Sequence, residues 1–287
     1  MAVELSVIIP AYNEKDSIVS TYEELKQVLS SISINYEIIF VDDGSTDGTG
    51  DTIRDLSGAK LINHCVNRGY GAALKTGIKD AHGHYILITD ADGTYPNLEI
   101  PRLLAYKDDF DMVVGARTGK NVKIQLYRKP AKKLLTMMAN FLSGTNIPDL
   151  NSGMRIFKKR DVIKFFKIIP DGFSFTTTIT LAYYSSGLSI KYLPINYHAR
   201  TGRSKIKPVR DGFNFILLIL RSVVYFNPLK VFLPASALLF ISSAVVALYS
   251  IIFLDRLLNT TTTILFISSI QIAIFGLLAD LIVRRSN

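Results

Sequence analysis

Short apolar runs alternate with polar segments of helical length over residues 5–115. The apolar runs predict strands at residues 5–9, 37–41, 60–63, 85–89 and 111–115. The polar segments predict helices at residues 16–30, 46–56, 71–80 and 98–106. Continuous apolar strands separated by helices are typical of a parallel sheet covered on both faces. We therefore expect an α/β fold whose ligands bind beyond the carboxyl ends of the strands.

Two long apolar runs near the C-terminus predict a pair of transmembrane helices. Residues 231–254 hold no charged side chain, and a helix of this length reaches about 36 Å, enough for a hydrocarbon layer of about 30 Å. Residues 264–283 carry one charge, Asp280, near their end. Buried core helices are the alternative, but such helices seldom stay uncharged on every face over this length.

The predicted elements divide the chain into three parts. Residues 1–207 form the α/β domain, residues 208–229 an amphipathic interfacial segment, and residues 230–287 a membrane anchor. Arg221 and Lys230 precede the first span, and Arg284 and Arg285 follow the second. The positive-inside rule then places both termini in the cytoplasm.

The charge of the chain is unevenly distributed. Lysine and arginine total 33 against 24 acidic residues, a net charge of +9. Basic residues gather between positions 117 and 133 and again between 200 and 210. Nucleic-acid binding is one explanation, but a basic surface beside a membrane anchor more naturally meets anionic lipid, so we expect no nucleic-acid partner. The single cysteine, Cys65, fits a reducing compartment.

Acidic residues follow three of the predicted strands. Glu14 comes after the first strand, Asp42 and Asp43 after the second, and Asp90 and Asp92 after the fourth. Carboxylates crowded at one sheet edge require a cation or a hydrogen-bonding ligand. The spacing of Asp90 and Asp92 suits a hard metal ion that also binds a diphosphate. A calcium loop is excluded because a loop starting at Asp43 has Arg54 in place of the glutamate at its twelfth position, and one starting at Asp90 has Tyr95 at its glycine position.

A glycine-rich segment, N-R-G-Y-G-A-A at residues 67–73, follows the third strand and opens a helix. Glycines at such a point allow backbone N–H groups to approach a phosphate. The segment matches neither a dinucleotide-binding fingerprint nor a P-loop. A plain tight turn is the alternative interpretation.

Taken together, the motifs resemble those of family 2 glycosyltransferases. V-I-I-P-A-Y-N-E, V-D-D-G-S-T-D, N-R-G-Y-G-A-A, D-A-D and N-S-G-M-R-I-F occur in this order between residues 7 and 157. More narrowly, the chain is similar to the polyprenyl-phosphate mannose and glucose synthases, such as dolichol-phosphate mannose synthase, over residues 5–207. The resemblance implies a GT-A fold, which is Rossmann-like with a mostly parallel sheet, together with inverting transfer and a Mg²⁺ or Mn²⁺ cofactor.

The resemblance also implies roles for individual residues. The residues expected to bind the nucleotide-sugar are Pro10, Tyr12, Glu14, Asp42, Asp43, Asn67, Gly71, Asp90, Ala91, Arg200, Arg203 and Lys205. Asp90 and Asp92 are expected to frame the metal, with Asp92 as the direct ligand. The residues expected at the reacting acceptor phosphate are Arg117, Ser152 and Arg155. Many relatives carry glutamine where this chain has Thr94, so a hydroxyl replaces one metal ligand.

We therefore expect a membrane-bound enzyme that moves a hexose from a GDP-mannose or UDP-glucose type donor to a polyprenyl or dolichyl phosphate. Such an acceptor is largely unprotonated at neutral pH, so no general base is required. The alternatives are a family 2 transferase acting on a lipid or glycan hydroxyl, with Asp149 as base, and a scaffold with a degenerate transferase domain. The sugar, the acceptor chain length and the oligomeric state cannot be read from the sequence.

Overall fold

The computed structural model describes residues 2–119, 136–137, 139–141, 144–172, 174–198, 224–225, 227–254 and 259–286. The chain divides into two compact units, Met1–Leu218 and Ile219–Asn287. Most of the interfacial segment predicted at 208–229 lies outside the described residues, and so do Arg200, Arg203 and Lys205.

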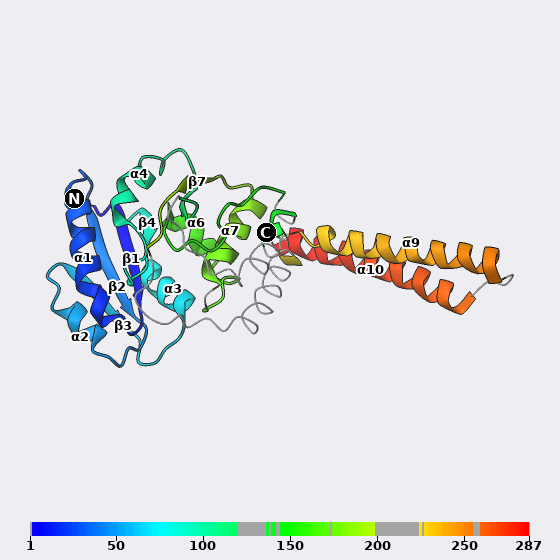
Figure 1. The fold of residues 1–287 in the computed structure, drawn as a ribbon, viewed down its shortest axis with the longest axis horizontal. Helices are drawn as coiled ribbons and strands as arrows, with labels where there is room; N and C mark the ends of the chain where they lie inside the picture. Colours follow the sequence, from blue (N-terminus) through cyan, green and yellow to red (C-terminus); the bar gives the residue numbers. More distant parts are fainter. Residues whose placement is uncertain are drawn as a thin grey trace. The chain divides into compact units, whose positions relative to one another are not determined.

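The first unit is built on a seven-stranded sheet with the order β3-β2-β1-β4-β6-β5-β7 (Figure 1). Its strands are β1 (Leu5–Ala11), β2 (Tyr36–Asp42), β3 (Ala59–Asn63), β4 (Tyr85–Ile88), β5 (Met112–Ala116), β6 (Arg155–Lys158) and β7 (Ile190–Pro194). All five predicted strands form, each within two residues of its predicted ends. The sheet is mostly parallel, and β6 alone among these strands runs antiparallel to both of its neighbours.

Helices connect and cover the strands. They are α1 (Lys15–Ser30), α2 (Thr49–Arg54), α3 (Tyr70–Asp80), the 3₁₀ turn η1 (Asn97–Glu99), α4 (Ile100–Leu104), α6 (Lys159–Lys164) and α7 (Phe175–Ser185). The helix predicted at 98–106 is split into η1 and α4, because Pro101 lacks an N–H group and favours the first turn of a helix. The helix predicted at 46–56 begins only at Thr49, after Gly48 in a left-handed conformation.

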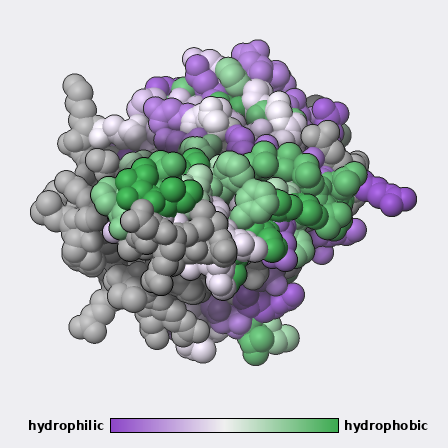
Figure 2. All heavy atoms as spheres, turned by 90° about the vertical axis from the view of Figure 1, so that its right-hand side faces the viewer, coloured by the Kyte–Doolittle hydropathy of each residue, from purple (hydrophilic) through white to green (hydrophobic). Residues whose placement is uncertain are grey.

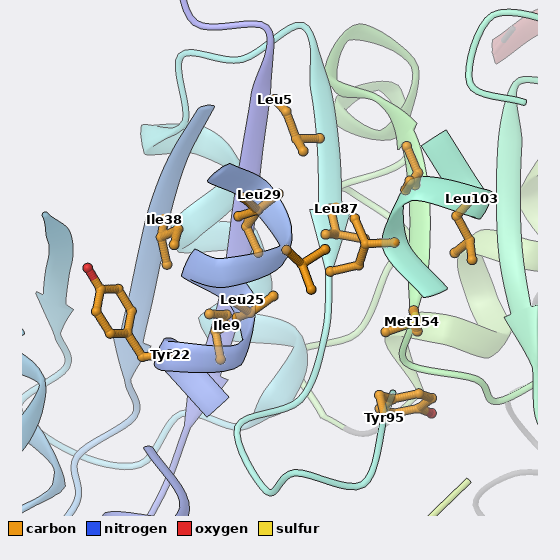
Figure 3. Close-up of a cluster of buried hydrophobic side chains, with 14 of the residues drawn as sticks. Leu5, Ile9, Tyr22, Leu25, Leu29, Ile38, Leu87, Tyr95, Leu103 and Met154 are labelled. Atoms are coloured by element: carbon orange, nitrogen blue, oxygen red, sulfur yellow. The ribbon is translucent and has the colours of Figure 1, made fainter. Parts of the chain in front are cut away.

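The sheet is buried on both faces by separate apolar layers. On one face, Tyr22, Leu25 and Leu29 of α1 pack with Ile9 and other strand residues of the same cluster (Figure 3). On the other face, side chains of α3 and α7 pack against the residues of opposite parity along the same strands. This two-sided burial explains why the strands read as continuous apolar runs in the sequence.

The reversed direction of β6 determines which segment meets the carboxyl ends of the parallel strands. Arg155, the first residue of β6, pairs with Ile88 at the end of β4 and with Val114 near the end of β5. An antiparallel strand presents its beginning where its neighbours present their ends. Residues 149–154 therefore arrive at the same sheet edge as the acidic motifs, although they lie far away in the sequence.

The second unit contains two apolar helices, α9 (Leu229–Leu254) and α10 (Asn259–Ser286), as the sequence predicts. Both are long and apolar enough to cross a membrane, by length and composition. Ser236 donates a hydrogen bond to the Ser269 carbonyl (2.8 Å), and Ser243 donates one to the Thr262 carbonyl (2.9 Å). These contacts make α9 and α10 an antiparallel hairpin. Large apolar side chains are exposed along both helices, and apolar surface is extensive in Figure 2.

Close packing of α3 on the sheet leads to a prediction about Gly77. A Cβ atom at this position would lie 2.5 Å from Cγ2 of Ile8 and 3.0 Å from Cγ2 of Val41. Gly77→Ala should therefore destabilise the fold by about 1–3 kcal/mol, despite the better helix propensity of alanine. The measurement is thermal unfolding of the full chain in detergent. Gly172→Ala is the control, because a Cβ there would meet nothing within 4 Å. Equal melting temperatures for the two variants would contradict the packing argument.

Candidate active site

A cavity of about 240 Å³ opens at the carboxyl ends of β1 and β4. It is lined by Pro10, Ala11, Tyr12, Glu14, Asp43, Asn67, Gly69, Tyr70, Ala73, Asp90, Ala91 and Asp92. Seven of these residues belong to the set predicted to bind the nucleotide-sugar, and an eighth, Asp92, is the predicted metal ligand. The structure thus brings together side chains from four separate sequence motifs.

Two loops that form the rim of the cavity are tied to each other. The side chain of Asn13, which follows β1, accepts a hydrogen bond from the Thr46 N–H (2.8 Å), and its own N–H donates to Ser45 Oγ (2.9 Å). Asn13 has a positive φ of 54°, a conformation that asparagine tolerates better than most residues. Asp42 lies beneath these loops and accepts from the Ser45 N–H (3.0 Å). Asp42 does not line the cavity, and its hydrogen bond supports the loop after β2.

Asp43 organises the loop after β3. Its carboxylate accepts hydrogen bonds from the backbone N–H groups of Arg68 (3.0 Å) and Gly69 (2.7 Å). The ring of His64 lies between Asp43 (2.6 Å from Nδ1) and the hydroxyl of Thr76 (3.0 Å from Nε2). His64 belongs to none of the motifs that the sequence analysis singled out. The available signal was its place directly after β3, at the same edge as the acidic motifs.

The glycine-rich segment packs against a backbone segment that lies about 100 residues later in the chain. The N–H groups of Gly71 and Ala72 donate to the carbonyls of Gly172 (3.1 Å) and Asp171 (2.9 Å). A Cβ atom at Gly71 would lie 2.3 Å from the Pro170 carbonyl oxygen. These glycines therefore allow close approach of another backbone segment. Gly71 does not line the cavity and its N–H is already bonded, so its contact with the nucleotide-sugar stays a prediction.

Asp90 and Asp92 both line the cavity, and each is held by a hydroxyl. Tyr70 donates to Asp90 Oδ1 (3.0 Å), and burial together with the Asp90 charge raises the pKa of Tyr70 well above its ordinary value. Thr94 donates to Asp92 Oδ1 through its hydroxyl (2.6 Å) and its N–H (3.2 Å). Thr94 is fully buried and does not line the cavity. Its hydroxyl therefore orients Asp92 from behind.

The oxygen atoms of Asp90 and Asp92 are suitable ligands for a hard divalent cation. Across the described ranges, no group of three or more His, Cys, Asp or Glu side chains is arranged to hold a metal ion. Two carboxylates alone leave most coordination positions open. The donor set therefore fits a Mg²⁺ or Mn²⁺ ion that completes its shell with phosphate and water oxygens.

Arg117 and Asp149 form a two-pronged ion pair near the start of β6. Nε and Nη2 of Arg117 lie 2.7 and 2.9 Å from the two oxygens of Asp149, and the Arg117 N–H also donates to Asp149 (2.9 Å). The guanidinium lies over the ring of Tyr197, 5.2 Å from its centroid. Burial opposes the charge of Arg117, but Tyr95 and Asp149 raise its pKa well above the ordinary value. The side chain of Arg117 is 20% exposed and that of Asp149 only 1%.

Ser152 and Arg155, for which a role at the acceptor phosphate is predicted, do not line the cavity. Both are fully buried. Ser152 donates to the Gly115 carbonyl (2.5 Å). Arg155 donates to the carbonyls of Ser152 and Thr176 and to the Thr180 hydroxyl, and burial lowers its pKa. Its donors therefore fasten the loop before β6 to α7, which makes Arg155 a structural residue in this geometry.

Comparison with known proteins places this arrangement in a family. The model of glycosyl transferase family 2 matches residues 6–166, more than half of the chain, and a second model, the GtrB C-terminal hairpin, matches residues 227–284. The chain belongs to glycosyltransferase family 2, as its motifs predict. It is therefore related to enzymes that transfer sugars.

Two curated relatives are similar over part of their length. An undecaprenyl-phosphate 4-deoxy-4-formamido-L-arabinose transferase from Aeromonas hydrophila is 35% identical over 54% of this chain and 49% of its own. A dolichol-phosphate mannosyltransferase from Pyrococcus furiosus is 31% identical over 71% of this chain and 59% of its own. The chain thus spans about half the length of the curated relatives it matches.

A solved structure with the same fold is glucosyl-3-phosphoglycerate synthase from Mycobacterium tuberculosis, in complex with Mn²⁺, UDP and phosphoglyceric acid. The TM-score is 0.60 at 17% identity, over 77% of this chain and 78% of that one. This likeness confirms the predicted GT-A-like α/β fold of the first unit.

The contact between Thr94 and Asp92 generates a prediction about metal affinity. Thr94→Val keeps the shape of the buried side chain but removes the hydroxyl that orients Asp92. Loss of a group that hydrogen-bonds to a metal ligand typically weakens metal binding by about 10-fold or more. We expect a matching increase in the Mn²⁺ concentration needed for half-maximal binding of UDP or GDP, measured by calorimetry.

Thr49→Val provides a matched control for Thr94→Val. Thr49 donates to Asp47 through its hydroxyl (2.6 Å) and N–H (3.0 Å), in the same arrangement, and neither residue lines the cavity. The Thr49 hydroxyl also accepts from the N–H of Glu14 (3.0 Å), so it supports the loop after β1 and contacts neither Asp90 nor Asp92. This variant should leave the Mn²⁺ requirement unchanged. An equal requirement in both variants would show that Thr94 has no specific effect on the metal.

Proposed function

We propose that the protein transfers a sugar from a nucleotide-sugar to a polyprenyl or dolichyl phosphate at the cytoplasmic face of a membrane. The family and the cavity support a transferase that uses a nucleotide-sugar. The two relatives named above act on undecaprenyl phosphate and dolichol phosphate, which supports a lipid phosphate as acceptor. They carry different sugars, so the donor proposed here, a GDP-mannose or UDP-glucose type hexose, rests on the motifs alone.

The donor would occupy the cavity with its two ends at different motifs. Pro10, Tyr12 and Glu14 line one part and would contact the base and ribose. Asp90 and Asp92 would hold a Mg²⁺ or Mn²⁺ ion together with the diphosphate. When bound, the metal would supply positive charge to stabilise the departing diphosphate. The solved neighbour that binds Mn²⁺ with UDP supports this assignment.

Arg117 would hold the acceptor phosphate. Asp149 occupies Nε and Nη2, and Nη1 makes no hydrogen bond with any residue in the described part of the chain. An arginine fixed on one side in this way presents its remaining donors in a defined direction. Arginine also matches phosphate oxygens better than lysine does. The phosphate oxygen would then attack the anomeric carbon without a base, because its second pKa is near 6.

The ion pair between Asp149 and Arg117 is the observation that favours a phosphate acceptor over a hydroxyl acceptor. A general base for a hydroxyl acceptor needs a carboxylate oxygen within reach of the incoming proton. In this structure both Asp149 oxygens accept hydrogen bonds from Arg117, and Oδ1 also accepts from the Asn151 N–H (3.3 Å). Asp149 is therefore committed to Arg117, which favours the phosphate acceptor over the hydroxyl alternative.

The membrane assignment rests on α9 and α10. Both helices are candidate spans, and the basic residues Lys230 and Arg285 lie at the ends that the positive-inside rule assigns to the cytoplasm. Arg200, Arg203 and Lys205 remain proposed contacts of the donor diphosphate, on the strength of their motif alone.

A double-mutant cycle tests the proposed acceptor. Arg117→Ala should lower kcat/KM for a polyprenyl phosphate by at least about 30-fold, with nucleotide affinity nearly unchanged, because one partner of a buried charge pair is lost. Asp149→Asn should cause a smaller loss. The kcat/KM of the double variant should be scarcely lower than that of Arg117→Ala, because each change breaks the same Arg117–Asp149 ion pair. The acidic limb of the pH–rate profile should persist in Asp149→Asn, because it belongs to the acceptor phosphate.

Asp51→Asn, which removes the carboxylate of an exposed ion pair with Arg54, is the control and should behave like the natural protein. The hydroxyl alternative makes the opposite prediction. If Asp149 were the base, Asp149→Asn would lose several orders of magnitude in kcat together with the acidic limb, while Arg117→Ala would have little effect.

Asp92→Asn tests the proposed metal ligand. It should nearly abolish turnover while nucleoside binding without metal persists, because a neutral amide binds a hard cation far more weakly. Asp47→Asn is the matched control, since Asp47 accepts equivalent hydrogen bonds from Thr49 outside the cavity. Turnover of Asp92→Asn in the presence of chelator, at the rate of the natural protein, would refute the assignment.

A further inference from the structure

One polar side chain lies on the exposed face of α10, halfway along its apolar stretch. Gln271 is exposed, and its amide forms no hydrogen bond with any described residue. The candidate span on α10 covers Thr260–Val283, so Gln271 is about 17 Å from either end of the span. If the helix spans a membrane, this amide sits at the centre of the hydrocarbon layer.

The opposite face of α10 is already occupied by α9. The buried and half-buried residues of α10 include a series at alternating intervals of three and four, namely Thr262, Leu265, Ser269, Ile272, Gly276, Ala279 and Val283, and the others, Ser268, Ala273 and Asp280, each lie next to a member of this series. Ser269 and Thr262 accept hydrogen bonds from serines of α9, and a Cβ at Gly276 would lie 2.6 Å from Phe232. This first seam closes the hairpin, and it leaves Gln271 pointing away from α9.

A second seam with the same spacing runs along the exposed face. It consists of Ile264, Ile267, Gln271, Ile274, Leu278 and Leu281. The five aliphatic members are between 48% and 64% exposed. Alternating intervals of three and four residues are the spacing at which two helices pack with a left-handed crossing. A single polar residue within such a seam commonly fixes the register and number of the helices.

Lipid tails cannot satisfy the amide of Gln271. A polar group in hydrocarbon without a partner is costly, and glutamine side chains hydrogen-bond between helices in membranes. An amide carries both donors and acceptors, so two glutamines can satisfy each other. Two copies of the chain insert with the same orientation, so their Gln271 residues lie at the same depth without further adjustment. A two-fold axis along the second seam would then bring the two amides together.

We propose that two copies of this chain associate in the membrane through the second seam of α10, with their Gln271 amides hydrogen-bonded to each other. The proposal depends on α10 spanning a membrane, and it is independent of the sugar and acceptor. A second copy is favoured over a different membrane protein because the matching depth follows from symmetry alone.

Cysteine cross-linking in membranes tests this contact on the full chain. The background is Cys65→Ser, which removes the single native cysteine. Leu278→Cys places a thiol on the second seam, and Leu277→Cys is the matched control, since Leu277 is equally exposed (54% against 51%) but about 100° away around the helix. Two differently tagged copies are expressed together and oxidised. We expect Leu278→Cys to give disulfide-linked dimers carrying both tags, at a yield at least several-fold above Leu277→Cys.

Gln271→Leu in the Leu278→Cys background should reduce the dimer yield several-fold, although it makes the helix more apolar. Single-molecule photobleaching of the protein without introduced cysteines independently counts the copies in each complex. The count should be two for the natural protein and should fall towards one in Gln271→Leu. Dimer yields that are equal for the two cysteine positions, or unchanged by Gln271→Leu, would overturn the proposal. Cross-linking of Leu278→Cys only to another, differently sized protein would also overturn it in favour of a foreign partner.

Discussion

Mutual repulsion among carboxylates is the constraint on which the architecture of the site depends. Asp42, the last residue of β2, and Asp43, Asp90 and Asp92, which follow β2 and β4, all lie at one edge of one sheet. Such a group is stable only if each member receives hydrogen-bond donors, a counter-charge or a cation. In this protein every member has a donor of its own: a loop N–H for Asp42, two loop N–H groups and His64 for Asp43, Tyr70 for Asp90, and Thr94 for Asp92.

These donors come from loops that the carboxylates then hold in place. The Asp43 carboxylate fixes the turn that carries Asn67 and Tyr70 to the cavity wall, and Arg117 is fixed by Asp149 in the same manner. The acids thus determine the shape of the walls as well as their charge. A site whose polar groups are oriented before the ligand arrives loses less free energy to reorganisation during the reaction.

The sequence was sufficient for features with a local signal. The strands β1 to β5 and the acidic residues after them were predicted because buried parallel strands are continuous apolar runs. β6 was missed, since its four residues R-I-F-K begin and end with a basic side chain, and its pairing with β4 joins segments about 70 residues apart. The hydrogen-bond partners of Arg155 and Gly71 could not be predicted for a related reason. A motif identifies the residue but does not say whether its donors face the cavity or a distant backbone segment.

The glycines at 69 and 71 tie two distant segments to one another. Gly69 adopts a φ of +101°, and a Cβ there would lie 2.6 Å from the carbonyl oxygen of Asp171. The wall of the cavity and the segment 170–172 before α7 therefore share a single backbone interface with no room for a side chain. In enzyme engineering, the two segments therefore have to be exchanged together. A chimaera that imports the glycine-rich loop of a relative has to import the partner segment as well, or keep both glycines.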